Sequence, residues 1–292
     1  MAPWLLRVAG ALLGWLAGSV LRIRRAHVEA CMRAANLTDA AAHARAMYAS
    51  LGASALEFLW MAWAGERALA GARIEEGSRS GWSRALARGQ GVVIAASHTG
   101  NWDLAACAVA REVELLVVTK HLRIGWLDRF WQRTRAARGV FLADAAGALA
   151  QSRRVLRRGG AVAMMIDQAP DTTRHALAAP FLGRTAWVDR APAALAASTG
   201  AALVVAASRR DERGDGHVLH VLDVLVPPAR PSRGWIDEAT VAATRALDAF
   251  VRAHPSQWLW LHRRWKAVPR AATLAPPCKT PSSSPAAASR AA

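Results

Sequence analysis

The segment SHTGNWD, residues 97–103, sets His98 and Asp103 five positions apart. It follows the apolar run GVVIAA, which predicts a buried strand, and it overlaps the start of NWDLAACAVAR, which predicts a helix. We therefore expect His98 at the carboxyl end of the strand. Asp103 falls in the first turn of the helix, where the helix field favours a carboxylate. Gly100 would give the tight turn between them its backbone freedom.

An imidazole that a carboxylate holds in place can serve as a general base. Asp103 could accept a hydrogen bond from one ring nitrogen of His98 and so fix the tautomer. The other nitrogen would then face the cleft beyond the strand ends, where open α/β sheets bind ligands. Because no G-x-S-x-G motif occurs in the chain, we expect direct deprotonation of a substrate hydroxyl and no covalent enzyme intermediate. Taken alone, the H-x4-D spacing also fits a polar pair without a catalytic role.

Strand and helix patterns alternate from about residue 90 onwards, which predicts a single-domain α/β fold with a mixed, mainly parallel sheet flanked by helices. The turn DERGDG, residues 211–216, predicts that the last strand pairs antiparallel with the one before it. We expect a long polar, proline-containing loop over 167–187. The strands are predicted at 91–97, 113–119, 139–143, 161–167, 201–208 and 217–226. The helices are predicted at 38–64, 101–111, 125–137, 145–158, 189–199 and 235–253.

The composition narrows the class of partner. The net charge of +17 suits an acidic partner such as anionic lipid, a phosphorylated substrate, an acidic protein or nucleic acid. A nucleic-acid binder is not expected, because the aromatic residues lie mainly in apolar runs and not among basic ones. The three cysteines (Cys31, Cys107 and Cys278) are far apart and form no CxxC pair, so we expect neither a metal site nor a disulfide framework.

The first 25 residues predict a membrane anchor. The uninterrupted apolar part, Val8 to Leu21, is 14 residues long, shorter than the ~20 needed to span a bilayer, although Arg7 could snorkel and extend it. Arg22, Arg24 and Arg25 follow and favour a cytoplasmic position for the rest of the chain. A cleaved signal peptide and a buried helix are the alternatives. We expect the anchor at 1–25, one folded domain at 26–268 and a disordered tail at 269–292.

The segment 97–103 resembles the HxGNWE signature of the late acyltransferases of bacterial lipid A biosynthesis, the lauroyl and myristoyl acyltransferases. That family belongs to the lysophospholipid acyltransferase superfamily, whose common motif is H-x4-D. Five further segments resemble motifs of the family in the family's order. They are WLDRFWQRTR (126–135), MMIDQ (164–168), PFLGRTA (180–186), LAASTGA (195–201) and WLWLHRRWK (258–266).

The resemblance implies a membrane-associated O-acyltransferase on the cytoplasmic face of the bacterial inner membrane. Such an enzyme moves a fatty acyl chain from an acyl thioester on acyl carrier protein to a hydroxyl of a lipid A precursor or related glycolipid, without metal or cofactor. His98 would be the general base and Asp103 would orient it. Arg135, or backbone N–H groups after His98, would stabilise the oxyanion. The residues implied in substrate binding are Asn101, Lys120, Arg135, Asp167, Gln168 and Arg264, with Arg263 and Lys266 beside the last.

Two departures from the family pattern leave the acceptor open. Asp103 stands where the lipid A enzymes usually carry Glu, and Lys120-His121 replaces their Arg-Pro. A lysophospholipid or another glycolipid is the alternative acceptor, and a non-enzymatic basic membrane-binding protein is the distant alternative function. We expect a hydrophobic tunnel beside His98 to set acyl chain length. The arginines of helix 145–158 form a basic face that is either solvated or docks the acidic carrier protein.

Overall fold

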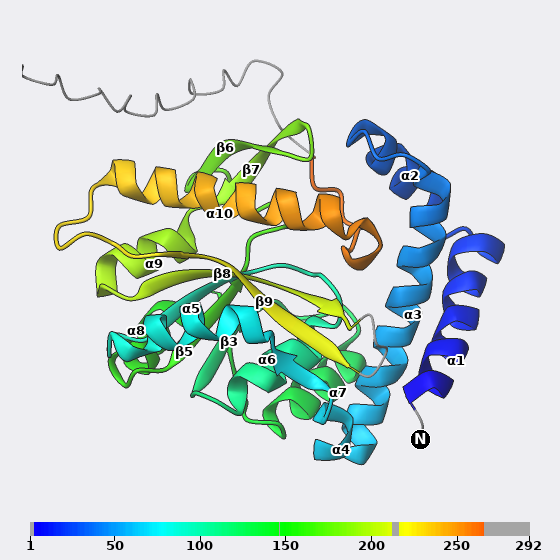
Figure 1. The fold of residues 1–292 in the computed structure, drawn as a ribbon, viewed down its shortest axis with the longest axis horizontal. Helices are drawn as coiled ribbons and strands as arrows, with labels where there is room; N and C mark the ends of the chain where they lie inside the picture. The colour runs from blue at the N-terminus through cyan, green and yellow to red at the C-terminus, as the bar shows by residue number, and fades with distance from the viewer. Residues whose placement is uncertain (1–2, 146, 212–215, 266–292) are drawn as a thin grey trace, which may run out of the picture.

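The computed structural model describes residues 3–145, 147–211 and 216–265 of the chain. These residues form a mixed α/β fold, a seven-stranded and mostly parallel sheet with helices on both faces (Figure 1), which confirms the predicted fold class. The strand order is β1-β9-β8-β2-β5-β3-β4. β5 therefore lies between β2 and β3, although it follows both in the chain.

The four strands β2, β5, β3 and β4 are mutually parallel, and β8 pairs parallel with β2 on the other side. β9 is antiparallel to β8, as the turn between them predicts, and it pairs parallel with β1 at the edge. The six predicted strands are confirmed, whereas the short β1 was not anticipated. The sheet strands are β1 (Ala72–Ile74), β2 (Val92–Ala96), β3 (Leu115–Thr119), β4 (Val140–Asp144), β5 (Ala161–Met165), β8 (Ala202–Arg210) and β9 (His217–Leu225).

The six predicted helices are also confirmed, although the one expected to start after Thr38 is capped by Asp39, whose side chain accepts from the N–H of Ala42. α5 was not predicted, because its run of Gly, Ser and Arg has little apolar periodicity. The helices are α1 (Pro3–Trp15), α2 (Arg25–Ala34), α3 (Ala40–Ala64), α4 (Glu66–Leu69), α5 (Glu76–Ala87), α6 (Trp102–Ala110), α7 (Gly125–Ala136), α8 (Ala148–Arg157), α9 (Ala191–Thr199) and α10 (Arg233–Ala253), with a short π-helix at Leu16–Val20 and a 3-10 helix at Pro255–Gln257.

The loop expected over 167–187 is wrong in its second half, which forms an antiparallel hairpin of β6 (Ala176–Phe181) and β7 (Arg184–Asp189). Leu182 and Gly183 both have positive φ, 52° and 78°, as a two-residue type I′ turn requires. Leucine is rare at the first position of such a turn, so the Leu-Gly pair does not predict a hairpin. The hairpin buries Phe181 and Leu182 in the core.

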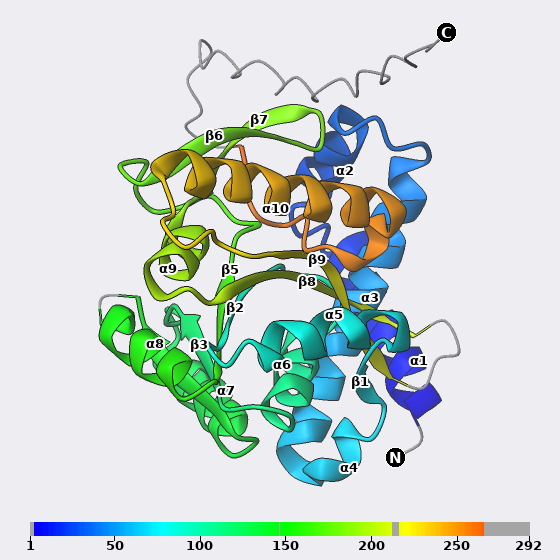
Figure 2. The same cartoon turned by 60° about the vertical axis from the view of Figure 1, so that its left-hand side comes forward.

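Alternation along the strands divides the core into two layers, one on each face of the sheet. In β2, Val93 and Ala95 join the cluster that α8, α9, α10 and the hairpin cover, whereas Val92 and Ile94 join the cluster under α5 and α6. Figure 2 shows α10 and the hairpin on one side of the sheet and α5 and α6 on the other. Because β2 and β5 are parallel neighbours, their carboxyl ends meet at one edge of the sheet.

The N-terminal helix α1 lies along α3 (Figure 1). A Cβ on Gly10 would come within 2.3 Å of the Ala53 backbone, and one on Gly14 within 2.2 Å of the Tyr48 carbonyl, so glycines permit this close approach. The outward face is apolar and exposed, with Trp4, Leu12 and Trp15 each at least 59% exposed. Among the described helices, none alone is long and apolar enough to cross a membrane, while Trp4–Val20 with Arg25–Ala34, bent by 91°, passes by length and composition.

Candidate active site

His98 lies just beyond the carboxyl end of β2, and its ring is held by Asp167, just beyond the end of the adjacent β5. The Nδ1 atom of His98 is 2.9 Å from Oδ1 of Asp167. Oδ2 of Asp167 accepts hydrogen bonds of 2.8 Å from the backbone N–H of His98 and from the indole N–H of Trp258. Since β2 and β5 are parallel neighbours, in register at Ala96 and Met165, their ends place the two side chains together.

The surroundings of Asp167 keep it ionised. Burial opposes the charged form, but the charge of His98 and the hydrogen bonds from His98 and Trp258 outweigh it and lower the pKa of Asp167 to about 2. An ionised Asp167 accepts only, so Nδ1 of His98 must be the donor. Neutral His98 therefore presents an unprotonated Nε2. Its side chain is 19% exposed, so solvent or a ligand can reach the ring.

Asp103 was expected to orient His98, and its contacts differ from that expectation. Its Oδ1 lies 2.7 Å from Nε and 2.6 Å from Nη2 of Arg135, and the Trp131 indole donates to it at 3.2 Å. From the first turn of α6, the short side chain reaches cations and donors of α7, while the neighbouring strand β5 supplies the carboxylate for the ring. The expected partner of His98 is thus corrected from Asp103 to Asp167.

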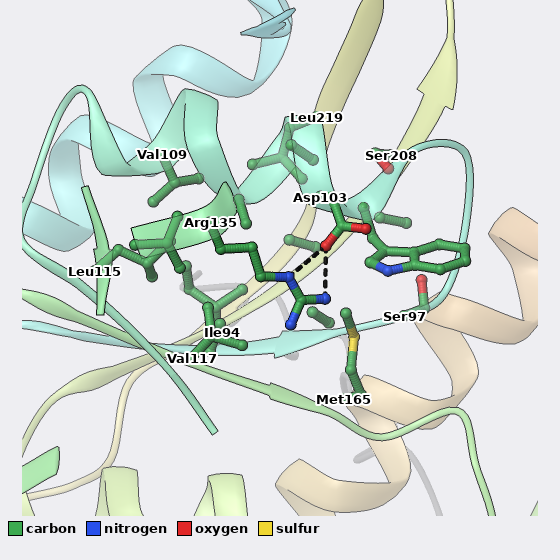
Figure 3. A pocket seen from close by; sticks show the side chains of 18 residues that line it. Ile94, Ser97, Asp103, Val109, Leu115, Val117, Arg135, Met165, Ser208 and Leu219 are labelled. Atoms are coloured by element: carbon green, nitrogen blue, oxygen red, sulfur yellow. Dashed lines mark hydrogen bonds and ion pairs between the residues drawn. The ribbon is translucent and has the colours of Figure 1, made fainter. Parts of the chain in front are cut away.

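The Asp103–Arg135 pair lines an apolar pocket (Figure 3). His98 is not among the lining residues, but its chain neighbour Ser97 and Trp102, whose ring lies 5.1 Å from the His98 ring, both are. The pocket encloses about 580 Å³ of empty space, part of it open to solvent. Figure 3 shows the Arg135 guanidinium pointing at Asp103, with Ser97 and Met165 near this polar end. The rest of the lining is almost entirely aliphatic and comes from α6 and from strands β2, β3, β4, β5, β8 and β9 of the one sheet: Ile94, Ala96, Ala105, Ala106, Val109, Leu115, Val117, Val140, Ala163, Ala206 and Leu219.

The turn between His98 and Asp103 is fixed on both sides. Gly100 has a φ of +57°, and a Cβ there would come within 2.8 Å of the Ser208 carbonyl, so the backbone requires glycine. Asn101 is 2% exposed and caps α6, because its Oδ1 accepts from the N–H of Leu104. Its Nδ2 donates to the Ser54 carbonyl and to Glu57. Asn101 therefore braces the turn, and its side chain is not placed to contact a substrate.

The other predicted binding residues take different positions. Lys120 is exposed and pairs with Asp171 at 2.7 Å. Gln168 lies beside the ring, with Nε2 3.4 Å from Nδ1 of His98. Arg264 is only 1% exposed and donates to the carbonyls of Gln168 and Trp187.

Burial and the nearby Asp167 act in opposite directions on Arg264, and burial lowers its pKa to about 10. Its placement fits a brace for the end of β5 and differs from the expected contact with acceptor phosphates. Arg263 lies in the described part of the chain and is exposed. Lys266 and the predicted tail lie outside the described residues.

Four residues of the site were missed from the sequence. Trp258 donates to Asp167, and Glu57, Arg210 and His217 form a polar cluster under the turn. The signal available for Trp258 was its place in the WLWLHRRWK segment. Glu57 stands in an otherwise apolar helical stretch, which marks a buried charge that needs a partner.

The chain is similar in sequence to known acyltransferases. Residues 2–267 match the family model described as bacterial lipid A biosynthesis acyltransferase. A phosphatidylinositol mannoside acyltransferase of Mycobacterium tuberculosis is 29% identical over 188 residues, 63% of this chain and 57% of the relative. The protein of that name in Mycolicibacterium smegmatis is 28% identical over 191 residues, 64% of this chain and 60% of the relative. The matched part thus spans under two thirds of each relative.

Proposed function

Because the chain belongs to the bacterial lipid A biosynthesis acyltransferase family, we propose that it transfers a fatty acyl group from an acyl thioester to a hydroxyl of a membrane glycolipid. The observation that carries this proposal is the pairing of His98 with the buried Asp167, next to an apolar pocket that the adjacent Ser97 lines. In the pair, His98 is a base of fixed tautomer. The apolar lining of the pocket can bind an alkyl chain.

The residues divide the reaction between them. Nε2 of His98 takes the proton of the acceptor hydroxyl while its oxygen attacks the thioester carbon. Asp167 stabilises the imidazolium that results. Collapse of the tetrahedral intermediate forms the ester, breaks the carbon–sulfur bond and returns the proton from His98 to the leaving thiolate. No covalent enzyme intermediate is needed.

The Asp103–Arg135 pair is suited to the oxyanion. Asp103 engages Nε and Nη2 of Arg135, and Nη1 lies 3.5 Å from the Thr119 hydroxyl. A guanidinium held in this way is preorganised and partly shielded from solvent, and such donors stabilise developing negative charge more strongly than mobile ones. In this proposal Asp103 positions Arg135, and the aliphatic pocket beyond it holds the acyl chain and limits its length.

The acceptor we propose is a glycolipid, either a lipid A precursor or a related mannosylated lipid. The family description points to the first, and the names of the mycobacterial relatives point to the second. Asp103 in place of the family's usual Glu, and Lys120 in place of its usual Arg, set this chain apart at the site. A lysophospholipid acceptor is the alternative.

The donor we propose is acyl carrier protein, docked on the basic face of α8. Four arginines of α8 and its cap point to solvent, while Ser152, Val155 and Leu156 are buried on the opposite side. Such a face complements an acidic partner and steers its approach. The four are Arg153, Arg154, Arg157 and Arg158.

We propose that the chain meets the cytoplasmic face of the inner membrane through α1, lying in the interface plane. The glycine face of α1 is occupied by α3, which leaves its apolar outward face for lipid. Leu59 and Trp63, near the carboxyl end of α3, are 52% and 83% exposed and add to this surface. Indole rings prefer such interfaces, and Arg7 and Arg22 can meet anionic headgroups.

The test is acyl transfer in vesicles that contain one candidate acceptor each, with acyl carrier protein or coenzyme A thioesters as donors. Wild-type protein should acylate a glycolipid, and His98→Ala should lower the rate by at least about 1000-fold while the protein remains folded by circular dichroism. Acylation of lysophospholipid alone would replace the acceptor. Full activity of His98→Ala would remove His98 from the mechanism.

A further inference from the structure

The buried polar cluster under the catalytic turn has no part in the chemistry described above. It joins three elements far apart in the chain: Glu57 from α3, Arg210 from the end of β8 and His217 from the start of β9. Glu57 is 8% exposed and His217 is 2% exposed. Charged groups are buried only when they have partners, so the contacts of this cluster show what it holds.

The cluster holds the backbone of Asn101, midway between His98 and Asp103. The N–H of Asn101 donates to Nδ1 of His217 at 3.2 Å. Nε2 of His217 lies 2.8 Å from Oε2 of Glu57. Since Nδ1 accepts, His217 must carry its proton on Nε2, and the ring is neutral. Burial, aided by the charge of Arg210, lowers the pKa of His217 against the opposing effect of Glu57.

Glu57 in turn is held as a carboxylate. Arg210 donates to both of its oxygens, at 3.2 Å to Oε2, and Nδ2 of Asn101 donates to Oε2 at 3.1 Å. Burial opposes ionisation, but the hydrogen bond from His217 and the hydrogen bond and charge of Arg210 outweigh it and hold the pKa of Glu57 well below its ordinary value. Glu57 therefore accepts from every neighbour, which fixes the tautomer of His217.

We propose that His217 is a positioning residue for the acyl transfer, acting through its unprotonated Nδ1 on the Asn101 N–H. This bond lies three residues after His98 and two before Asp103, so it sets the path of the turn that carries both. The inference rests on the proposed function for its kinetic part. Its geometric part, the tautomer of His217, is independent of any substrate.

Two conservative substitutions separate the two bonds of the ring. His217→Asn places an amide oxygen near the former Nδ1, so it keeps an acceptor for the Asn101 N–H and loses the donor to Glu57. His217→Gln reaches the former Nε2 with its amide nitrogen, so it keeps the donor to Glu57 and loses the acceptor for the turn.

The two variants are expected to rank in opposite orders for kcat and for thermal stability. His217→Gln should lower kcat about 100-fold, because a displaced catalytic group costs that much, with KM changed less than about threefold. His217→Asn should retain kcat within about tenfold yet unfold at a lower temperature than His217→Gln, because Glu57 loses a charge-assisted bond. If kcat instead follows thermal stability across the two variants, the role is structural only and the proposal is overturned.

His220 supplies the matched control. It lies on the same strand, its Nδ1 is 3.1 Å from Glu75 and Arg209 donates to its Nε2, but none of these partners belongs to the catalytic turn. His220→Asn and His220→Gln should leave kcat unchanged. A loss of kcat equal to that of His217→Gln would overturn the proposal.

Nitrogen-15 NMR of the histidine rings in wild-type protein tests the geometry without an activity assay. The expected signals for His217, assigned by its loss in His217→Gln, are those of a neutral ring protonated at Nε2. A doubly protonated ring at neutral pH, or a proton on Nδ1, would overturn the proposal. An inactive wild-type protein with the expected tautomer would contradict the proposed function and leave the geometric part supported.

Discussion

Asp103 and Asp167 are both buried carboxylates of the candidate active site, 4% and 2% exposed, and they meet opposite kinds of partner. Asp103, five residues from His98, binds the permanent cation Arg135. Asp167, 69 residues from His98, binds the titratable ring. Asp103, the carboxylate nearer to His98 in sequence, is thus not the one that contacts its ring. The carboxylate that pairs with His98 is determined by the strand register that sets the ends of β2 and β5 side by side, and not by the spacing within one motif.

The largest loss of activity is expected for Asp167→Asn. An amide in this place can offer its N–H to Nδ1 of His98 and select the wrong tautomer, so kcat should fall about 10⁴-fold. Steady-state kinetics on the glycolipid acceptor measures this. Asp237→Asn is the control, because it removes a carboxylate of α10 that pairs with Arg190. It should leave kcat unchanged. A smaller loss for Asp167→Asn than for Asp103→Asn would reverse the assignment of roles.

Asp103→Asn should lower kcat/KM by about 100-fold to 1000-fold, because Arg135 loses the charge that aims it at the oxyanion. Asp103→Glu keeps the charge and should retain activity within about tenfold. The double variant Asp103→Asn/Arg135→Gln should cost little more than the single ones, since the two side chains act as one unit. Strict additivity of the two losses would show that they act separately.

Acid unfolding measures how much ionised Asp167 contributes to stability. The pKa of Asp167 is lowered to about 2 from an ordinary 3.8, so its ionised form stabilises the fold. This contribution is complete above the ordinary pKa and is lost as the pH falls from about 4 to 2. It amounts to about 2 kcal/mol. Denaturant titrations at several pH values should give wild type a steeper loss of stability there than Asp167→Asn, and equal slopes would contradict the assignment.

The smallest expected effect concerns the apolar pocket next to Asp103. Ala163→Leu fills part of it and should shift the ratio of kcat/KM for short over long acyl thioesters by about tenfold. Mass spectrometry of the products gives this ratio. Leu149, an exposed apolar residue of α8 outside the pocket, supplies the control Leu149→Ala. An unchanged ratio in Ala163→Leu would place the acyl chain elsewhere.

Local patterns carried much of the fold to the correct prediction. Apolar runs marked the six main strands, and the turn at 211–216 marked the antiparallel end of the sheet. The β6–β7 hairpin escaped, because Leu182 occupies a backbone conformation that glycine or asparagine usually signals. β1 escaped as well, since three residues show no periodicity.

Several residues of the candidate site were anticipated from the sequence, but the pairing of their side chains was not. His98, Arg135, Asp167 and Gln168 were all named from motifs, and they do lie around one turn. Their pairing depends on which strands are neighbours, and a strand order in which β5 enters between β2 and β3 is not written in any local pattern. Arg264 shows the same limit, because its burial follows from the hairpin that sequence reasoning missed.

The late entry of β5 bears on how the chain acquires activity during synthesis. β2, β3 and β4 are synthesised before β5. β2 and β3 cannot become neighbours in the sheet, because β5, which begins some 40 residues after β3 ends, lies between them. Pairings of this long range are slow to form. A nascent chain that ends before residue 161 contains His98 but neither β5 nor Asp167, so the His98–Asp167 pair and the central sheet are completed in the same folding event.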